Sequence, residues 1–144
     1  MSLEAAAEGY EYFDVAADVG VHAWGETVAG CLRQCALGMF DLIVPTRAVE
    51  PVETREVAAR GPAIEVLLVN WLNECLYVHD LEGFVVHDVG MPQVTGTGIH
   101  SVLHGEPVDP ARHPRGTVVK AATFHGLEVV ERRGRATARV ILDI

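Results

Sequence analysis

Lysine is almost missing from this 144-residue sequence, in which Lys120 is the only one. The 11 Lys and Arg residues face 20 Asp and Glu residues, which gives a formal net charge of −9. A protein that binds nucleic acid on its own usually presents a basic patch that displaces the counterions of the phosphates. The densest basic cluster, Arg132, Arg133 and Arg135 around Gly134, is typical of an exposed hairpin turn. We therefore expect no strong autonomous nucleic-acid binding.

Serine, cysteine and long apolar runs are scarce as well. The two serines, Ser2 and Ser101, lack the glycine-flanked motif that exposes a catalytic serine. The three cysteines have no paired spacing, which indicates a reducing compartment, so we expect a cytoplasmic protein with buried free thiols.

No run approaches the ~20 apolar residues that a membrane span requires, and no signal peptide begins the chain. We therefore expect no membrane association.

The hydrophobic pattern predicts two amphipathic helices. The first follows the N-cap candidate Thr27 and ends before Pro45, and the second begins near Ala63 with a continuous apolar stripe. Period-two alternation or short apolar runs predict strands, and a polar segment at 47–60 is extended. The predicted strands cover 10–17, 21–24, 84–94, 99–105, 118–131 and 135–143.

Helices and strands do not alternate regularly in this pattern, which favours an α+β fold. We expect a single compact domain over residues 1–144, with both helices packed on a mixed, largely antiparallel sheet system of about six to seven strands. Residues 1–8 are treated as a leader that is open to disorder.

Cysteine and histidine give little indication of a site. Cys31 and Cys35 share the apolar face of the first helix, so buried structural thiols are favoured over metal ligands or nucleophiles. The seven histidines lack the spacing of a zinc site. His125 alternates in phase with apolar residues, which favours a hydrogen-bonded histidine in or near the core over a functional one.

Acidic residues near both ends of the chain form a more specific pattern. Asp18 ends the first strand, and Asp143 is followed only by Ile144, whose side chain shares an apolar face with Val140 and Leu142. An anchored terminus would place the Asp143 side chain beside the α-carboxylate of Ile144, and Asp18 could join them from a neighbouring strand. Such oxygen-rich sites select Ca²⁺, Mg²⁺ or Mn²⁺. Spacing alone nevertheless favours the plainer interpretation, a turn aspartate and a solvated strand end.

Four strings of residues resemble the archease family, in the family's order and over nearly the whole chain. They cover residues 10–20 (followed by His22), 71–77, 119–125 and 138–144. The sequence departs from the family pattern at Val15 and Ala16, where histidine and threonine are usual, and at Cys75 and Phe124, where leucine and tyrosine are common. None of these four differences removes a carboxylate. At position 15, however, valine cannot perform any role that the family's histidine has.

The resemblance implies a function that composition does not show. Archeases resemble activators of an RtcB-type RNA ligase, a GTP- and metal-dependent enzyme that joins RNA ends in tRNA splicing and RNA repair. They are expected to promote transfer of GMP to the ligase histidine and thus multiple turnover. The family's metal ligands correspond to Asp18, Asp143 and the terminal carboxylate of Ile144. The protein would then be an accessory factor and not an enzyme.

The same resemblance suggests how a ligase would be contacted. Lys120 would contact phosphate or an acidic group, and the Asn73, Glu74 and Tyr77 face of the second helix would be a docking surface or a plain solvated face. An acidic protein would be steered to a basic ligase. GTP and tRNA would be met only indirectly, through the ligase.

Two other functions stay open at this point. One is a stand-alone metal-dependent enzyme on a small substrate, with His22 or His125 as the base beside the two aspartates. The other is a chaperone-like module that needs no metal.

Overall fold

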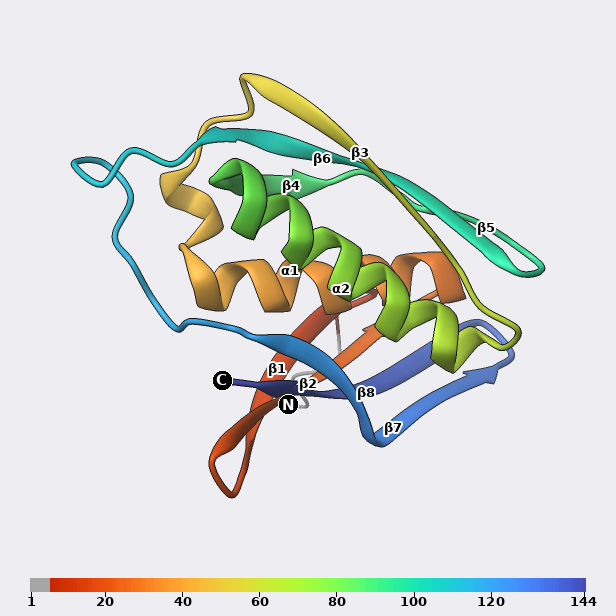
Figure 1. Ribbon diagram of the computed structural model, residues 1–144. Helices are drawn as coiled ribbons and strands as arrows, with labels where there is room; N and C mark the ends of the chain where they lie inside the picture. Colours follow the sequence, from red (N-terminus) through yellow and green to blue (C-terminus); the bar gives the residue numbers. More distant parts are fainter. Residues whose placement is uncertain (1–5) are drawn as a thin grey trace.

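Two helices lie between two antiparallel sheets in the computed structural model, which describes residues 6–144 (Figure 1). The first sheet has the order β1–β2–β8–β7, with bounds Gly9–Val15, Asp18–Gly25, Arg135–Asp143 and Ala121–Arg132. The second has the order β3–β6–β4 with β5 also paired to β6, and its bounds are Glu53–Arg60, Gly98–Pro107, Phe84–Val89 and Gln93–Thr95. The helices are α1 (Val28–Ile43) and α2 (Ile64–Glu82), and a short 3₁₀ turn, η2, covers Thr46–Ala48.

The helices begin and end where the sequence predicts. The hydroxyl of Thr27 accepts the N–H of Gly30 at 3.0 Å and caps α1. α2 ends at Gly83, which takes φ +61° and donates its N–H to His79 O at 2.9 Å. Each helix contacts both sheets, so apolar side chains are buried on more than one side of it. The helix layer is therefore the core of the domain.

The α+β prediction is confirmed, with two differences in the strands. Residues 6–144 form eight strands, and the strand pairs within both sheets are all antiparallel. The predicted strand 84–94 divides into β4 and β5 because the segment 90–92, which includes Pro92, interrupts the ladder. The polar segment 47–60 supplies β3, whose outer side chains face solvent.

The buried thiols agree with the expectation from the sequence. Cys31, Cys35 and Cys75 are free and fully buried. Burial raises the pKa of the Cys75 thiol well above its usual range, which keeps it protonated and unreactive. Ser101 is also buried, and its hydroxyl accepts the indole N–H of Trp71 at 2.9 Å. Among the described residues, neither the cysteines nor Ser101 are placed for nucleophilic chemistry, and Ser2 lies outside the described residues.

Part of the leader lies outside the described residues, which begin at Ala6. Within the described part, Trp24 Nε1 donates to Ala6 O at 3.1 Å, and the Glu8 carboxylate lies 3.7 Å from the Arg33 guanidinium. In residues 6–144, none of the helices has the length and apolar character needed to cross a membrane.

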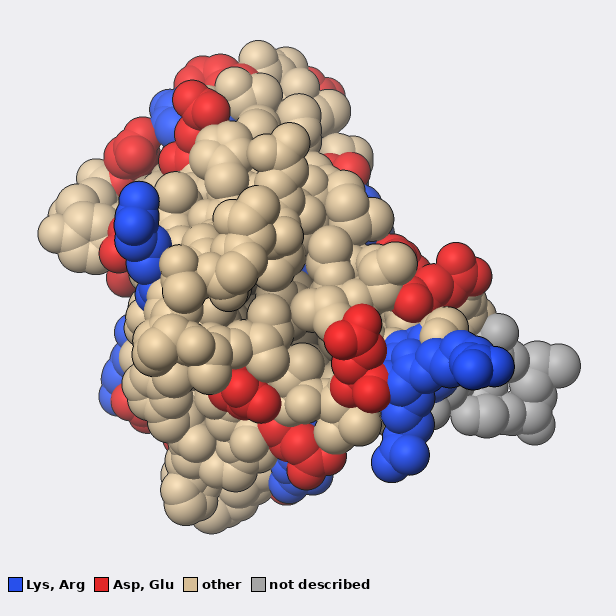
Figure 2. All heavy atoms as spheres, turned by 90° about the vertical axis from the view of Figure 1, so that its right-hand side faces the viewer, with Lys and Arg blue, Asp and Glu red and all other residues tan. Residues whose placement is uncertain are grey.

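One end of the molecule carries an apolar hollow at the start of both helices. Its volume is about 450 Å³, and it is lined by Val28, Ala29, Ile64, Val94, Val129 and Glu131. Figure 2 shows the corresponding face as largely uncharged in its middle, with Asp and Glu side chains and groups of Lys and Arg around the uncharged area.

A buried ionic cluster fixes the connection between β6 and β7. The Glu106 carboxylate is 5% exposed and accepts from Arg112 Nη2 at 2.6 Å, from the N–H of Glu50 at 2.7 Å and from His113 Nε2 at 3.0 Å. His113 Nδ1 accepts the N–H of Asp109 at 2.8 Å, so Nε2 carries the proton. These contacts, with that of Arg112 the strongest, lower the pKa of Glu106 from 4.5 to about 2.

This shift predicts an acid-sensitive contribution to stability. Because the folded-state pKa of Glu106 lies below its unfolded value, the carboxylate stabilises the fold above pH 4.5, and this contribution is lost as the pH falls toward 2. Glu106→Gln should lower the urea unfolding midpoint at pH 7, and the gap from the parent chain should close between pH 4.5 and 2. A gap that is the same at pH 7 and pH 2.5 would contradict this assignment.

The β1–β2 turn predicts a substitution that stabilises the fold. Ala16 takes φ +48° in the two-residue turn between Val15 and Asp18, a conformation in which a Cβ costs about 1 kcal/mol. Ala16→Gly should therefore stabilise the domain by about 1 kcal/mol and raise its thermal midpoint by about 3 °C. Ala17→Gly is the matched control, since Ala17 has no positive φ, and calorimetry should show it to be neutral or destabilising.

Candidate functional site

Two aspartates lie at the same end of the first sheet. Asp18 is the first residue of β2 and Asp143 is the last residue of β8. The antiparallel pairing of these strands places Val19 opposite Leu142, and one further step in the same register places Asp18 opposite Asp143. Residues directly opposite in such a ladder have Cβ atoms about 5 Å apart. The structure thus brings together two residues that lie 125 positions apart in the sequence.

Alternation along the strands gives the direction of these side chains. Val21 and Leu142 are fully buried against the helices, so Asp18 and Asp143 belong to the opposite, outer face of the sheet. Ile144 follows Asp143 and is half-buried against the core. The last residue of this sequence is therefore anchored, as the sequence predicts, and its main chain lies beside the two aspartates.

Two carboxylates at adjacent strand positions repel each other, and a hard cation relieves this repulsion. The chemistry of the donors fits Ca²⁺, Mg²⁺ or Mn²⁺, because all of them are oxygen atoms. Within residues 6–144, the structure holds no group of three or more His, Cys, Asp or Glu side chains placed for a metal ion. A site at Asp18 and Asp143 therefore needs further oxygen ligands, such as the carboxylate of Ile144, water or a partner.

Lys120 lies at the same end of the sheet. Its N–H donates to Asp143 O at 2.7 Å, and the pairing of Ala121 with Asp143 places Lys120 opposite Ile144. The side chain is exposed. The main chain of Lys120 is thus tied to that of Asp143, whereas alternation directs its side chain to the face of Ile144, opposite to that of Asp18 and Asp143.

His22 does not join this group. It is four residues from Asp18 along β2, a distance of about 13 Å in a strand. Its Nδ1 lies 3.1 Å from the carboxylate of Glu11, the residue opposite on β1, and its ring lies 5.7 Å from that of Trp24. The arrangement does not place His22 as a base beside the aspartates.

The space between His22 and Asp18 is filled by residues that the sequence analysis missed. Gly20 leaves room for the ring of Phe13, which would clash with any Cβ at position 20. The Arg139 guanidinium lies 4.2 Å from the centre of that ring. Gly20 lay outside the predicted strands, so no local pattern indicated this contact.

The prediction for His125 is wrong, because His125 is exposed and not in the core. The register between β7 and β8 shifts between Thr123 and Glu128, so the intervening residues form a bulge that includes Gly126 at φ +62°. The period-two alternation used for the prediction therefore breaks at this point. His125 donates its N–H to the hydroxyl of Thr123 at 3.4 Å.

The predicted docking face on α2 is reduced to two residues. The amide of Asn73 makes two hydrogen bonds to the main chain of Ala122: its Nδ2 donates to Ala122 O at 3.1 Å, and its Oδ1 accepts the N–H at 2.8 Å. This amide holds α2 against β7 and is not free for a partner. Glu74 and Tyr77 are exposed, Tyr77 by 61%, and remain available.

Comparison with known proteins identifies relatives along almost the whole chain. The model of the archease protein family matches residues 10–144. The archease of Methanopyrus kandleri is 35% identical over 138 residues, which cover 94% of this chain and 99% of that protein. The archease of Ictalurus punctatus is 36% identical over 138 residues, which cover 94% of this chain and 85% of that protein.

Solved structures agree with the fold. The solution structure of Methanobacterium thermoautotrophicum protein 1598 superposes with a TM-score of 0.78 at 34% identity, covering 94% of this chain and 99% of that one. The crystal structure of an archease from Thermotoga maritima, described as a possible chaperone, has a TM-score of 0.64 at 15% identity and shares the fold, with 93% of this chain and 96% of that chain covered. Sequence and structure together show that this chain belongs to the archease family.

Proposed function

We propose that this archease is an accessory activator of an RtcB-type, GTP-dependent RNA ligase in tRNA splicing and RNA repair. It would act through a divalent cation held by Asp18, Asp143 and the carboxylate of Ile144. The observation that supports this proposal is the register of β2 and β8, whose last pair, Val19 with Leu142, lies directly next to both aspartates at one end of the sheet. Carboxylate oxygens close to each other are the donors that hard divalent cations select.

Asp18, Asp143 and the Ile144 carboxylate are called the acidic end of the sheet here. Their placement favours action on a macromolecule over action on a small substrate. Asp143 and Lys120 are exposed, so another protein can reach them directly. His22, one of the two bases that a stand-alone enzyme would use, is engaged with Glu11 and lies far along β2. An accessory role is also compatible with the description of the Thermotoga relative as a possible chaperone.

Each residue of the acidic end would have a separate role in this activation. Asp18 and Asp143 would hold the cation, with the Ile144 carboxylate as a third ligand, and a bound cation supplies positive charge for the phosphate oxygens of GTP on the ligase. Lys120, at the same end of the sheet, would add a second positive charge. These groups would orient the phosphates toward the ligase histidine, whereas tRNA would be met only through the ligase.

Charge and surface support a docking step. The net charge of −9 would steer this protein toward a basic ligase. Exposed Glu74 and Tyr77 lie on α2 one turn or less from Asn73, which is bonded to β7 at Ala122. Ala122 pairs with Leu142, next to Asp143, so the docking residues and the acidic end lie on connected elements.

The metal part of the proposal predicts opposite effects of one substitution. Asp143→Asn removes repulsion with Asp18, so the metal-free protein should become more stable by about 0.5 kcal/mol. The same variant should lose most of the rise in thermal midpoint that millimolar Ca²⁺, Mg²⁺ or Mn²⁺ gives the parent chain. Thermal unfolding with chelator and with each ion measures both effects.

Asp14→Asn is the matched control, because Asp14 is exposed on the same hairpin but is paired with Val19. It should leave the metal-induced rise intact. A parent chain that none of the three ions stabilises would refute the metal site.

The activator role predicts many turnovers from a limiting amount of ligase. RNA ligation by a cognate RtcB-type ligase at substoichiometric concentration should exceed one turnover per ligase only when this protein is present. Asp143→Asn should reduce the effect by at least about 10-fold, the consequence of losing one charged ligand. Asp14→Asn should remain active. A ligase that turns over equally well without the protein would rule out the activator role.

A further inference from the structure

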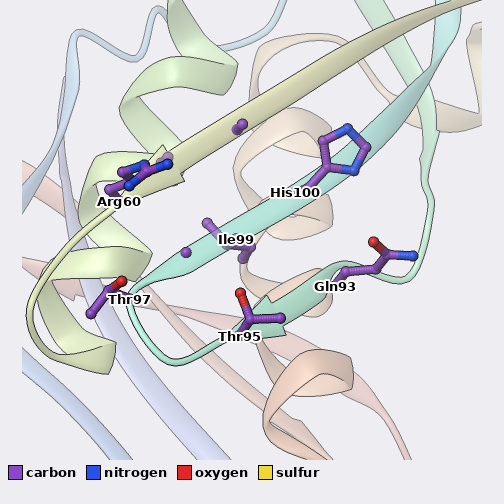
Figure 3. A pocket seen from close by; sticks show the side chains of 9 residues that line it. Arg60, Gln93, Thr95, Thr97, Ile99 and His100 are labelled. Carbon is purple, nitrogen blue, oxygen red and sulfur yellow. The ribbon is translucent and has the colours of Figure 1, made fainter.

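The outer face of the second sheet carries a hollow of about 430 Å³ (Figure 3). It is formed where β3, β5 and β6 run side by side near the β5–β6 turn, and its polar side chains are Arg60, Gln93, Thr95, Thr97 and His100. This sheet lies across the helix layer from the sheet that carries Asp18 and Asp143 (Figure 1). The hollow is thus separate from the site proposed above.

Small residues create the floor of this hollow. Gly98 on β6 is paired with Arg60 on one side and with Thr95 on the other, while Ala58 is paired with His100. Ile99 is buried toward the helices, so its neighbours in the strand face outward. Larger residues flank this floor of glycine and alanine, and the result is a concave sheet surface.

Neither backbone nor packing requires glycine at position 98. Its φ is not positive, and a Cβ there would meet only ordinary contacts, the nearest being Thr95 Oγ1 at 3.5 Å. By contrast, a Cβ at Gly105 in the same strand would clash with the main chain of Val85. The fold needs glycine at position 105, whereas packing does not require it at position 98, where a larger side chain would stand in the hollow.

Polar side chains surround this floor, and one of them, His100, is already paired with a carboxylate, since its Nε2 lies 3.1 Å from Glu56 Oε1. Figure 3 shows Arg60 and Thr97 at one end, Thr95 and Gln93 along one side, and His100 at the other end. Arg60 is exposed and forms no ion pair with another of the described residues, while its carbonyl oxygen is held by Asn70 Nδ2 at 2.7 Å. A guanidinium on a fixed strand end, with two hydroxyls beside it, is suited to the oxygens of a phosphate.

A second hollow continues the first one. It has a volume of about 310 Å³, shares Gln93 and His100 with the first, and extends along β6 to His104. Met91, which is 55% exposed, also lines it. Imidazole and thioether groups offer apolar and polarisable surface to a flat ring system.

We propose that these two hollows bind a phosphomonoester of mononucleotide size. Arg60, Thr95 and Thr97 hold the phosphate above Gly98, and the nucleoside lies along His100 and Gln93 toward His104. The size supports this ligand, since the first hollow alone has the volume of a small-molecule pocket and exceeds what a phosphate ion fills.

The test uses the full chain without ligase and with a chelator, so that it is independent of the function proposed above. AMP, adenosine and inorganic phosphate are titrated into ¹⁵N-labelled protein, and the amides of Thr95, Thr97 and Gly98 are followed by NMR. Saturable shifts with AMP are expected, together with weaker binding of phosphate and little binding of adenosine. Arg60→Gln should weaken AMP binding at least about 10-fold.

Two further variants make the test specific. Arg47→Gln is the matched charge control, because Arg47 is an exposed arginine on η2 outside both hollows, and AMP binding should persist in it. Gly98→Val places a side chain on the floor and should abolish binding, with an unchanged thermal midpoint as evidence that the fold is intact.

Each remaining outcome is decisive. Adenosine that binds as tightly as AMP, or equal losses in Arg60→Gln and Arg47→Gln, would overturn the phosphate site. Inorganic phosphate that binds as tightly as AMP would overturn the nucleotide-sized ligand. Asp143→Asn should bind AMP like the parent chain, so failure of this proposal and failure of the ligase proposal are distinguished.

Discussion

The pairing of β2 with β8 is the constraint on which the rest of the candidate site depends. It joins the beginning of the chain to its end and sets Val19 against Leu142. A shift of one residue would turn Asp18 and Asp143 to opposite faces of their strands, because side chains alternate with a period of two. The buried residues Val21 and Val140 oppose such a shift, since it would expose them. Burial of the core thus holds two like charges together.

The helix layer gives the two sheets separate outer faces. Because α1 and α2 contact both sheets, each sheet packs one face against the helices and exposes the other face to solvent. On the first sheet the outer face ends in carboxylates, and on the second it carries a floor of small residues with Arg60 beside it. One small domain thereby carries the proposed cation site and the proposed phosphate site on opposite sides of its helix layer.

The local sequence was sufficient to predict the helices and most strands, but it was not sufficient to predict where a strand is irregular. Thr27, Pro45 and Gly83 act within a few residues, so the helix limits follow from the sequence. The bulge at 124–127 depends on how β7 meets β8, and it moved His125 out of the predicted alternation. Asn73 has the polar character of a surface residue, yet its partner Ala122 lies 49 positions away and no local pattern marks it. The Phe13–Arg139 contact is also long-range.

The sequence by itself determined the residue types of the acidic end, the apolar stripes of both helices and the family to which the chain belongs. These are properties of local pattern and of order along the chain. Only the tertiary structure decided which groups are neighbours: Asp18 with Asp143, Lys120 with Ile144, and Arg60 with Thr95 across Gly98. The reason is physical, because strand register is chosen by burial of the whole core and by hydrogen bonding between distant segments, and neither is encoded at a single position.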